Sequence, residues 1–331
     1  LLHDGEKPVF LLTGQDYRLS SYEGYRQFWA IYHKPPKPEH RNYLLERRDS
    51  LIPLDERSFK GAFYTPLIVV DKAYDLLTET LGKNWQKNYI VWDMCCGVGN
   101  LEVKHSNPRN LFMSTLDKAD IDVMKASKIC VAATRFQYDY LNDDITDTGA
   151  IDYNLTAKVP PALQQAIKEG KQILILINPP YAEAGTDVSS SEKAGVAKSK
   201  FSTVAMRDYG KATNELFTQF LARIAQEIPT ATVAMFSKLK YVNAPNFEKF
   251  RQVWQAKYLG GFVVPSKTFE GLSGNFPIGF LVWNTAKKEI LKEISVNVLD
   301  KNINAIGEKS FYNLANSNFL IFICFRFQKF Y

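Results

Sequence analysis

The feature that most constrains the fold is an alternation, between residues 61 and 285, of short apolar runs with segments of helical periodicity. The apolar runs have the length of strands, and the segments between them repeat apolar residues every three or four positions. Because this alternation is typical of a parallel sheet covered by crossover helices, the sequence predicts an α/β fold with a doubly wound, Rossmann-like sheet. The predicted strands cover 89–93, 111–117, 173–177, 232–236, 262–265 and 278–283, and the predicted helices cover 66–82, 119–128, 161–169 and 211–227.

The two ends of the chain differ from this central region. The last two predicted strands follow each other too closely for a crossover helix, so we expect them to be antiparallel, and residues 286–331 to form a β-rich extension. Residues 1–60 are rich in aromatic and charged residues, with helical spacing over 20–34 and 41–50. We interpret them as a helical N-terminal extension that caps the central domain. A basic arm that contacts DNA or another domain is the alternative.

Composition narrows the class of protein further. The chain has 331 residues, 46% of them apolar and 23% charged, which allows a sizeable core and excludes a disordered chain. Its net charge of +6 permits a polyanionic partner without requiring one. No apolar run is long enough for a membrane helix, the first residues do not resemble a signal peptide, and the cysteines form no C-x-x-C pair. We therefore expect a cytoplasmic protein without membrane contact and, because the histidines are scattered, without a metal site.

The first motif that carries chemistry is V-W-D-M-C-C-G-V-G-N at 91–100. It predicts a strand that ends in Asp93, a turn with Gly97 and Gly99, and a helix after the turn. Glycines let a ligand approach the backbone, a helix N-terminus attracts anions, and an acid at the strand end can accept a cationic amino group. Asp117 ends the next strand, 24 residues further on, close to the spacing at which an acid binds ribose hydroxyls. Both acids favour a nucleoside site over a chance tight turn.

The second motif is I-L-I-L-I-N-P-P-Y at 173–181. A buried strand delivers Asn178 to the carboxyl edge of the sheet, where Pro179 and Pro180 fix the backbone and remove two N–H donors. The side-chain oxygen of Asn178 and the carbonyl of Pro179 remain as acceptors beside the ring of Tyr181. Such a cluster is better explained as a site for a planar amino group than as a core strand that merely ends in proline.

Three motifs, in this order, resemble those of the gamma-class N6-adenine DNA methyltransferases: F-Y-T-P at 63–66, D-M-C-C-G-V-G-N at 93–100 and N-P-P-Y at 178–181. The resemblance covers about residues 60–285. It implies a seven-stranded sheet, S-adenosylmethionine as the methyl donor, double-stranded DNA as the substrate with a flipped adenine as the acceptor, and a restriction-modification system. N-P-P-Y is shared with methyltransferases of RNA and of protein glutamine, whereas F-Y-T-P ahead of the glycine motif is more particular to the DNA enzymes. Met94-Cys95 departs from the Pro-Ala that the family often has there, which affects packing more than chemistry.

The resemblance also implies roles for individual residues. It places Asp117 at the ribose of the cofactor, and in Q-Y-D-Y-L at 137–141 it makes Asp139 an acceptor for the adenine amino group while Tyr140 stacks on the ring. The other cofactor-binding residues that it implies are Tyr64, Thr65, Asp93, Cys95, Gly97, Gly99 and Asn178. The catalytic residues are Asn178, Pro179, Pro180 and Tyr181, and the aromatic residue that contacts the target base, within S-G-N-F-P-I-G-F at 273–280 or just before it, is Phe276 or, as second candidate, Phe269.

Two acceptors that hold both hydrogens of the adenine amine would free its lone pair for the methyl group, and Tyr181 would stack on the flipped base. The alternatives are an N-P-P-Y enzyme acting on RNA or protein glutamine, and a catalytically silent DNA-binding module. Roughly 45 residues follow the last motif, fewer than an ordinary domain has, so we expect either that the chain is truncated before a target-recognition domain or that recognition comes from another domain or subunit. The polar segment 183–200, with Lys193, Lys198 and Lys200, predicts either a loop that closes over DNA or a plain linker.

Overall fold

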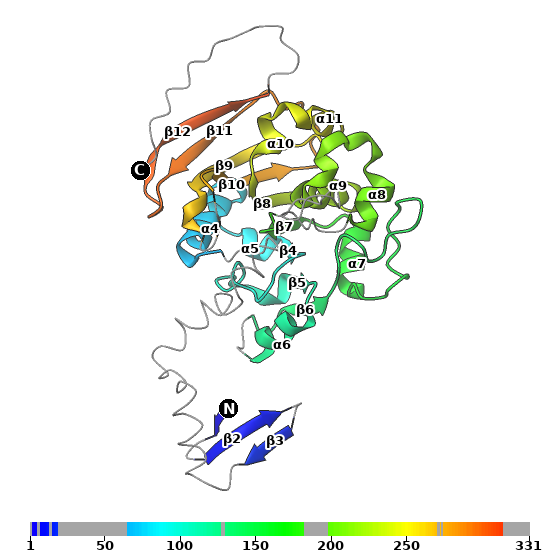
Figure 1. Ribbon diagram of the computed structural model, residues 1–331, viewed down its shortest axis with the longest axis vertical. Helices are drawn as coiled ribbons and strands as arrows, with labels where there is room; N and C mark the ends of the chain where they lie inside the picture. Colours follow the sequence, from blue (N-terminus) through cyan, green and yellow to red (C-terminus); the bar gives the residue numbers. More distant parts are fainter. Residues whose placement is uncertain are drawn as a thin grey trace, which may run out of the picture. The chain divides into compact units, whose positions relative to one another are not determined.

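The computed structural model describes residues 2–4, 7–12, 15–18, 65–126, 130–181, 198–269, 272 and 274–313. The chain divides into two compact units, Leu1–Arg48 and Asp49–Tyr331. Figure 1 shows the elements of both units along the chain.

The first unit contains a three-stranded antiparallel sheet in the order β1 (Leu2–Asp4), β2 (Lys7–Leu12), β3 (Gln15–Arg18). The extension expected to be helical is therefore not helical in its first part. The run V-F-L-L at 9–12 favours a strand, and the dipeptides at 5–6 and 13–14, which separate the strands in the sequence, each contain a glycine, as hairpin turns do. The helices expected over 20–34 and 41–50 lie outside the described residues.

The second unit is built on a nine-stranded sheet in the order β12-β11-β9-β10-β8-β7-β4-β5-β6 (Figure 1). The five strands from β4 to β8 are parallel, while β10 runs antiparallel to both of its neighbours, β8 and β9. The α/β class and the antiparallel late strands are thus confirmed. The strands are β4 (Ile90–Asp93), β5 (Leu111–Thr115), β6 (Thr134–Gln137), β7 (Ile173–Ile177), β8 (Thr232–Lys238), β9 (Lys257–Pro265), β10 (Pro277–Asn284), β11 (Glu293–Leu299) and β12 (Ala305–Tyr312).

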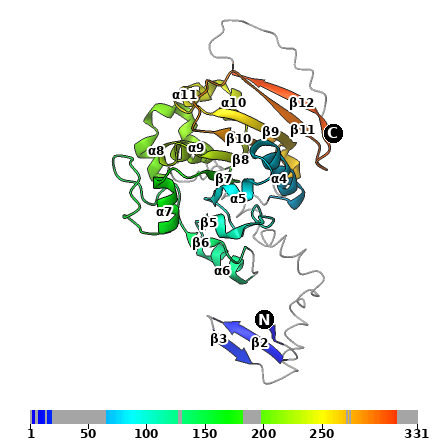
Figure 2. The same cartoon turned by 180° about the vertical axis from the view of Figure 1, so that it is seen from behind.

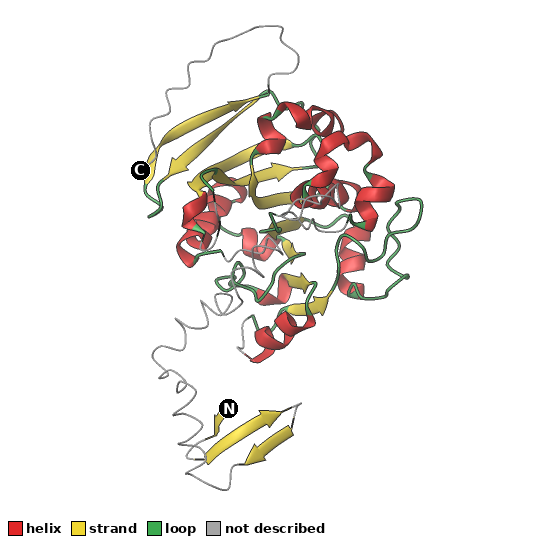
Figure 3. Cartoon of the chain, in the orientation of Figure 1, coloured by secondary structure: helices red, strands yellow, loops and turns green. Residues whose placement is uncertain are grey.

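Helices cover both faces of this sheet, as Figures 2 and 3 show from opposite sides. Alternate residues of β7 separate two cores: Ile175 belongs to the core that α7, α9 and α11 cover, and Leu174 to the core that α4 and α6 cover. Because both faces are covered, all five residues of β7 are buried, which explains its uninterrupted apolar run. The helices are α4 (Leu67–Leu81), α5 (Trp85–Asn88), α6 (Lys118–Ala126), α7 (Pro161–Lys168), α8 (Lys200–Ala205), α9 (Leu216–Glu227), α10 (Lys240–Asn243) and α11 (Glu248–Val253), with short 3-10 turns at Pro108–Asn110, Arg207–Asn214, Pro245–Phe247 and Ser266–Thr268.

Several predicted elements differ from the structure. The helix expected over 211–227 begins only at Leu216, because the preceding segment is a 3-10 turn interrupted by Gly210 at φ +64°. The resemblance implies seven strands, but β11 and β12 extend the sheet beyond β9 to nine. These two strands lie within 286–331, where a β-rich extension was expected without strand bounds, and β6 was not predicted. All three strands are partly exposed and lack a continuous apolar run, so the sequence pattern does not define them.

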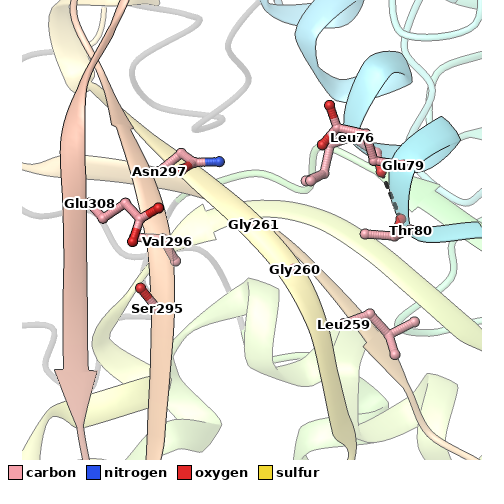
Figure 4. Close-up of a pocket in the computed structure, with 10 residues that line it drawn as sticks. All are labelled: Leu76, Glu79, Thr80, Leu259, Gly260, Gly261, Ser295, Val296, Asn297 and Glu308. Carbon is pink, nitrogen blue, oxygen red and sulfur yellow. Dashed lines mark hydrogen bonds between the residues drawn. The ribbon is translucent and has the colours of Figure 1, made fainter.

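A hollow of about 520 Å³ lies where β11 separates from β9 (Figure 4). The two strands pair only at Asn297 with Phe262 and at Val298 with Val263, so they diverge beside Gly260 and Gly261. Its lining comes from the end of α4 and from β9, β11 and β12, and includes none of the residues predicted for the functional site. In the described part of the chain, no helix is both long and apolar enough to cross a membrane.

Candidate functional site

The strand order reverses between β4 and β7. From β4 the chain continues to β5 and β6 on one side of the sheet, and then to β7 and β8 on the other. Open α/β sheets bind ligands outside the carboxyl ends of the strands at such a reversal. Here β4 ends at Asp93, and Asn178 directly follows β7, so two of the predicted site residues flank the reversal.

Asp93 is held by the turn that follows it. Only 1% of the residue is exposed, and its Oδ1 accepts a hydrogen bond of 2.8 Å from the backbone N–H of Cys95. Gly97 and Gly99 adopt φ values of +52° and +84°, which glycine tolerates best. Cys95 is half-buried, and burial raises the pKa of its thiol well above the usual value, so the thiol is neutral.

The helix expected after this turn does not form. Residues 97–104 are turns, and the next regular element is the 3-10 turn Pro108–Asn110. The left-handed conformations of Gly97 and Gly99 prevent a helix from starting there, and Pro108 disfavours helical backbone just before it. No helix N-terminus therefore contributes to ligand binding at this turn.

Glu102 is a residue of this site that the sequence analysis missed. It is fully buried, and no amide, hydroxyl or cation among the described residues donates to its carboxyl oxygens. Its carboxyl group lies against that of Asp93, and burial together with the charge of Asp93 raises the pKa of Glu102 well above its usual value. Burial also raises the pKa of Asp93, to about 6, while hydrogen bonds from Glu102 and Cys95 oppose the shift. At neutral pH Asp93 is ionised and the neutral Glu102 donates to it.

Thr65, Asn178 and Tyr181 form a hydrogen-bonded chain after β7. The side-chain amide of Asn178 donates to Oγ1 of Thr65 at 2.8 Å, and the Tyr181 hydroxyl donates to Oδ1 of Asn178 at 2.7 Å. Thr65 and Tyr181 are each only 4% exposed, so the ring of Tyr181 is packed in the core. Pro179 is buried and Pro180 half-buried. The F-Y-T-P and N-P-P-Y motifs thus meet at Thr65 and Asn178, whereas Tyr64 lies outside the described residues.

Lys238, at the end of β8, is a second residue that the sequence analysis missed. Its ammonium group donates to the carbonyl of Tyr181 at 3.1 Å and lies 5.8 Å from the centre of the Phe276 ring. Phe276 is half-buried beside this group, whereas Phe269 is 1% exposed and packs edge-on against Phe236 in the core. Of the two aromatic candidates, the structure therefore places Phe276 near N-P-P-Y. The strand predicted over 232–236 ended two residues too early, so the sequence analysis did not place Lys238 at the end of a strand.

Asp117 and Asp139 follow the carboxyl ends of β5 and β6, the first and second strands beyond β4 in the sheet. Asp117 is exposed just before α6, and Asp139 is half-buried, with its carboxylate accepting from the backbone N–H of Leu141 and the amide of Asn142. Tyr140 is placed differently from the expectation. Its ring is 2% exposed and stacks on Phe220 with ring centres 5.4 Å apart, so neither face of the ring is presented at the sheet edge.

The lysines of the polar segment are only partly described. Lys193 lies outside the described residues, Lys198 is exposed, and Lys200 begins α8 with its ammonium group 3.0 Å from Oδ1 of Asp147. Within the described ranges no group of three or more histidine, cysteine or acidic side chains is arranged to hold a metal ion.

Comparison with solved structures identifies the fold. No protein-family model and no curated protein matches the chain. DrdV, in a complex with DNA, superposes with a TM-score of 0.55 at 14% identity over 84% of this chain. LlaGI, a type ISP restriction-modification enzyme solved as a nuclease-deletion mutant with a DNA substrate mimic, gives 0.55 at 12% identity over 86%. Both share the fold of this chain.

These proteins are longer than the chain. It spans 32% of the DrdV chain and 31% of the LlaGI chain. A type I restriction-modification methyltransferase subunit from Streptococcus thermophilus, with a TM-score of 0.46 at 14% identity over 83% of this chain, is covered over 54% of its length.

Proposed function

We propose that the chain is an S-adenosylmethionine-dependent DNA methyltransferase that acts on the N6 amino group of adenine in a restriction-modification system. The observation that carries this proposal is the convergence of three distant motifs at the strand reversal. Thr65 of F-Y-T-P is hydrogen-bonded to Asn178 of N-P-P-Y. Asn178 follows β7, and β7 pairs with β4, which ends in Asp93. The shared fold of DNA-bound DrdV and LlaGI supports a doubly wound methyltransferase sheet.

The acids along β4, β5 and β6 fit the donor groups of S-adenosylmethionine. When bound, this cofactor supplies an electrophilic methyl group. Asp93 would accept from its ammonium group, Asp117 from its ribose hydroxyls and Asp139 from its adenine amine, with the turn around Gly97 and Gly99 against the methionine part. The buried carboxyl of Glu102, which lacks a donor, supports a cationic ligand beside Asp93. Tyr140 is not included, because its ring is enclosed in the core.

The β7 side fits an amine that has to be activated. An exocyclic adenine amine is a weak nucleophile because its lone pair is delocalised into the ring. Oδ1 of Asn178 and the Pro179 carbonyl would accept its two hydrogens and bias the nitrogen towards a tetrahedral shape, which localises the lone pair on the nitrogen, while Pro180 contributes no competing N–H. Thr65 orients the amide of Asn178, because it accepts from Nδ2 and leaves Oδ1 for the amine. Phe276 would contact the base.

The target pocket has to open before a base can enter it. Oδ1 of Asn178 now accepts from the Tyr181 hydroxyl, and the Tyr181 ring is buried. A flipped adenine would replace this hydroxyl at Asn178 and stack on the ring once Tyr181 moves. Removing a base from the duplex costs a few kcal/mol, and this stacking recovers part of it.

Since the chain spans about a third of DrdV and LlaGI, we propose that target recognition comes from another domain or subunit. A basic excess of +6 and the exposed Lys198 support contact with DNA phosphates.

The decisive experiment supplies methyl-labelled S-adenosylmethionine with double-stranded DNA, structured RNA and a glutamine-containing release-factor protein in parallel. We expect label in DNA alone, recovered as N6-methyladenine after digestion to nucleosides. Label in RNA or protein would favour the other N-P-P-Y activities. Cofactor binding measured by calorimetry, without transfer to DNA of any sequence, would indicate a silent module.

A further inference from the structure

Helix α9 carries a fully buried ion pair. Arg223 is 0% exposed, the Glu227 side chain is 2% exposed, and Nε of Arg223 lies 3.0 Å from Oε2 of Glu227, one helical turn further on. A buried ion pair is rarely more stable than apolar residues of the same volume, because desolvation offsets the attraction between the charges. We therefore interpret this ion pair as a means of holding the segments around it in a specific geometry.

The guanidinium group of Arg223 holds the segment that follows β6. It donates to the carbonyls of Tyr140 and Asp143, the second at 3.0 Å, and to the hydroxyl of Tyr138 at 2.7 Å. It also lies 4.3 Å from the centre of the Tyr140 ring, whose other contacts include Phe220 on the same helix. A planar guanidinium presents several donors in a fixed fork, so one side chain fixes three points of this segment.

Asp139 is the residue of this segment that remains at the sheet edge. Its neighbours Tyr138 and Tyr140 are 1% and 2% exposed and point to Arg223, whereas Asp139 itself is half-buried. Its backbone N–H donates to Oδ2 of Asp143 at 2.9 Å, so the turn is closed on the outer side as well. Among the described strands, β6 is at the edge of the sheet and pairs with β5. The sheet holds the start of this segment, where the backbone N–H of Tyr138 donates to the carbonyl of Thr115 at 2.9 Å, and Arg223 anchors the residues beyond it.

The other partner of the ion pair, Glu227, lies close to Tyr140 and also contacts a separate part of the chain. Oε1 of Glu227 accepts from the hydroxyl of Tyr153, which lies in a separate part of the chain. Tyr138 and Tyr153 thus each contribute one phenol to the same ion pair, but only Tyr138 belongs to the segment that carries Asp139. The chain therefore offers a matched pair of positions for a test.

We propose that Arg223 is a positioning residue for recognition of the cofactor's adenine: it fixes the segment 138–143 so that Asp139 meets the adenine amino group. This inference rests on the proposed function, in which Asp139 accepts from that amine.

The test uses calorimetry to compare the affinities of the protein for two compounds, the product of the cofactor and an analogue of that product. One is S-adenosylhomocysteine, and the other is the analogue in which a keto oxygen replaces the 6-amino group. The wild type should bind the first about tenfold more tightly or better, since a keto oxygen cannot donate to Asp139 and instead places a second acceptor against its carboxylate. A 2′-deoxyribose analogue reports on Asp117, which follows another strand, β5, and is independent of Arg223.

The main variant is Arg223→Met combined with Glu227→Gln, which removes both buried charges together and leaves neither unpaired. We expect its preference for the amino compound to fall to about twofold or less, while its preference for ribose over deoxyribose stays unchanged. A folded double variant that keeps the wild-type preference for the amine would overturn the proposal.

Two milder variants decide the question if the double variant does not fold. Tyr138→Phe should lower the amine preference by about threefold, whereas Tyr153→Phe, which removes a half-buried phenol bonded to the same ion pair, should lower only the melting temperature. Equal effects of the two on the amine preference would show that Arg223 acts on overall stability alone. A wild type that binds both compounds equally would overturn this inference, and one that binds neither would overturn the proposed function.

Discussion

The two sides of the strand reversal differ in how their polar groups are satisfied. On the β4 side, Glu102 is buried without a donor, and Asp117 is exposed. On the β7 side, both ends of the Asn178 amide are bonded, to Thr65 and to the hydroxyl of Tyr181. A ligand rich in donors gains new hydrogen bonds on the β4 side, whereas on the β7 side it has to replace existing ones. In the proposed function, the first side is prepared for a cofactor, and the second is closed until a substrate enters.

The largest effect is expected at the closed side. Asn178→Ala removes an acceptor that acts on the amine in the transition state, so methyl transfer should fall by on the order of a hundredfold or more. Cofactor affinity should change little, because the acids of β4, β5 and β6 remain. Single-turnover transfer and calorimetry on the same preparation measure both quantities.

Asn110→Ala is the matched control for this variant. Asn110 lies next to β5 at the opposite, amino edge of the sheet, where its amide donates to the carbonyl of Lys87. Its replacement should leave transfer unchanged. If the folded Asn178→Ala protein turned over normally, the proposed role of Asn178 would be wrong.

The next effect concerns the β4 side and depends on pH. Burial raises the pKa of Asp93 from 3.8 to about 6. Because the folded state binds this proton more tightly than the unfolded state, the contribution of Asp93 to stability is greatest below pH 3.8, decreases as the pH rises to about 6, and is then constant. A shift of this size corresponds to about 3 kcal/mol at neutral pH.

Asp93→Asn removes this penalty, because the amide cannot ionise, its oxygen can still accept from Cys95, and its N–H₂ can donate to Glu102. We expect the variant to gain about 2 to 3 kcal/mol over the wild type above pH 6, to gain little near pH 4, and to lose cofactor binding. Denaturant unfolding at several pH values measures this difference. A gain that did not depend on pH would show that the charge of Asp93 is not its source.

The sequence predicted the parts of the site that have a local signal. Strand β7 has the predicted bounds, because a strand buried on both faces is an uninterrupted apolar run bounded by Asn178 and Pro179. Asp93 and Asn178 were located because each directly follows such a strand. The doubly wound arrangement and the roles of these residues remain predictions.

Residues that depend on packing between distant segments could not be found in this way. Glu102 lies in a turn without periodicity, and its contact with Asp93 depends on the left-handed glycines between them. Lys238 reaches Tyr181 only because β8 pairs with β7. Tyr140 was predicted to stack on a ligand because its neighbours fit a motif, but Phe220, 80 positions away, occupies that face. Local pattern places a residue at the edge of a sheet, whereas tertiary packing decides which way its ring faces.

The smallest expected effect concerns the hydrogen bond from Tyr181 to Asn178, which we expect to keep the β7 side closed. Tyr181→Phe keeps the ring for stacking but removes the hydroxyl that occupies Oδ1 of Asn178. Stability should decrease by about 1 kcal/mol, the net value of one such hydrogen bond. If base entry has to break this bond, the variant should open more easily, and its KM for DNA should fall by up to about fivefold while kcat changes little. Tyr181→Ala, which also loses the ring, should instead raise KM. If Tyr181→Phe raised KM as well, the hydroxyl would contact the substrate rather than close the pocket, and the β7 side would be a binding surface already formed, like the β4 side.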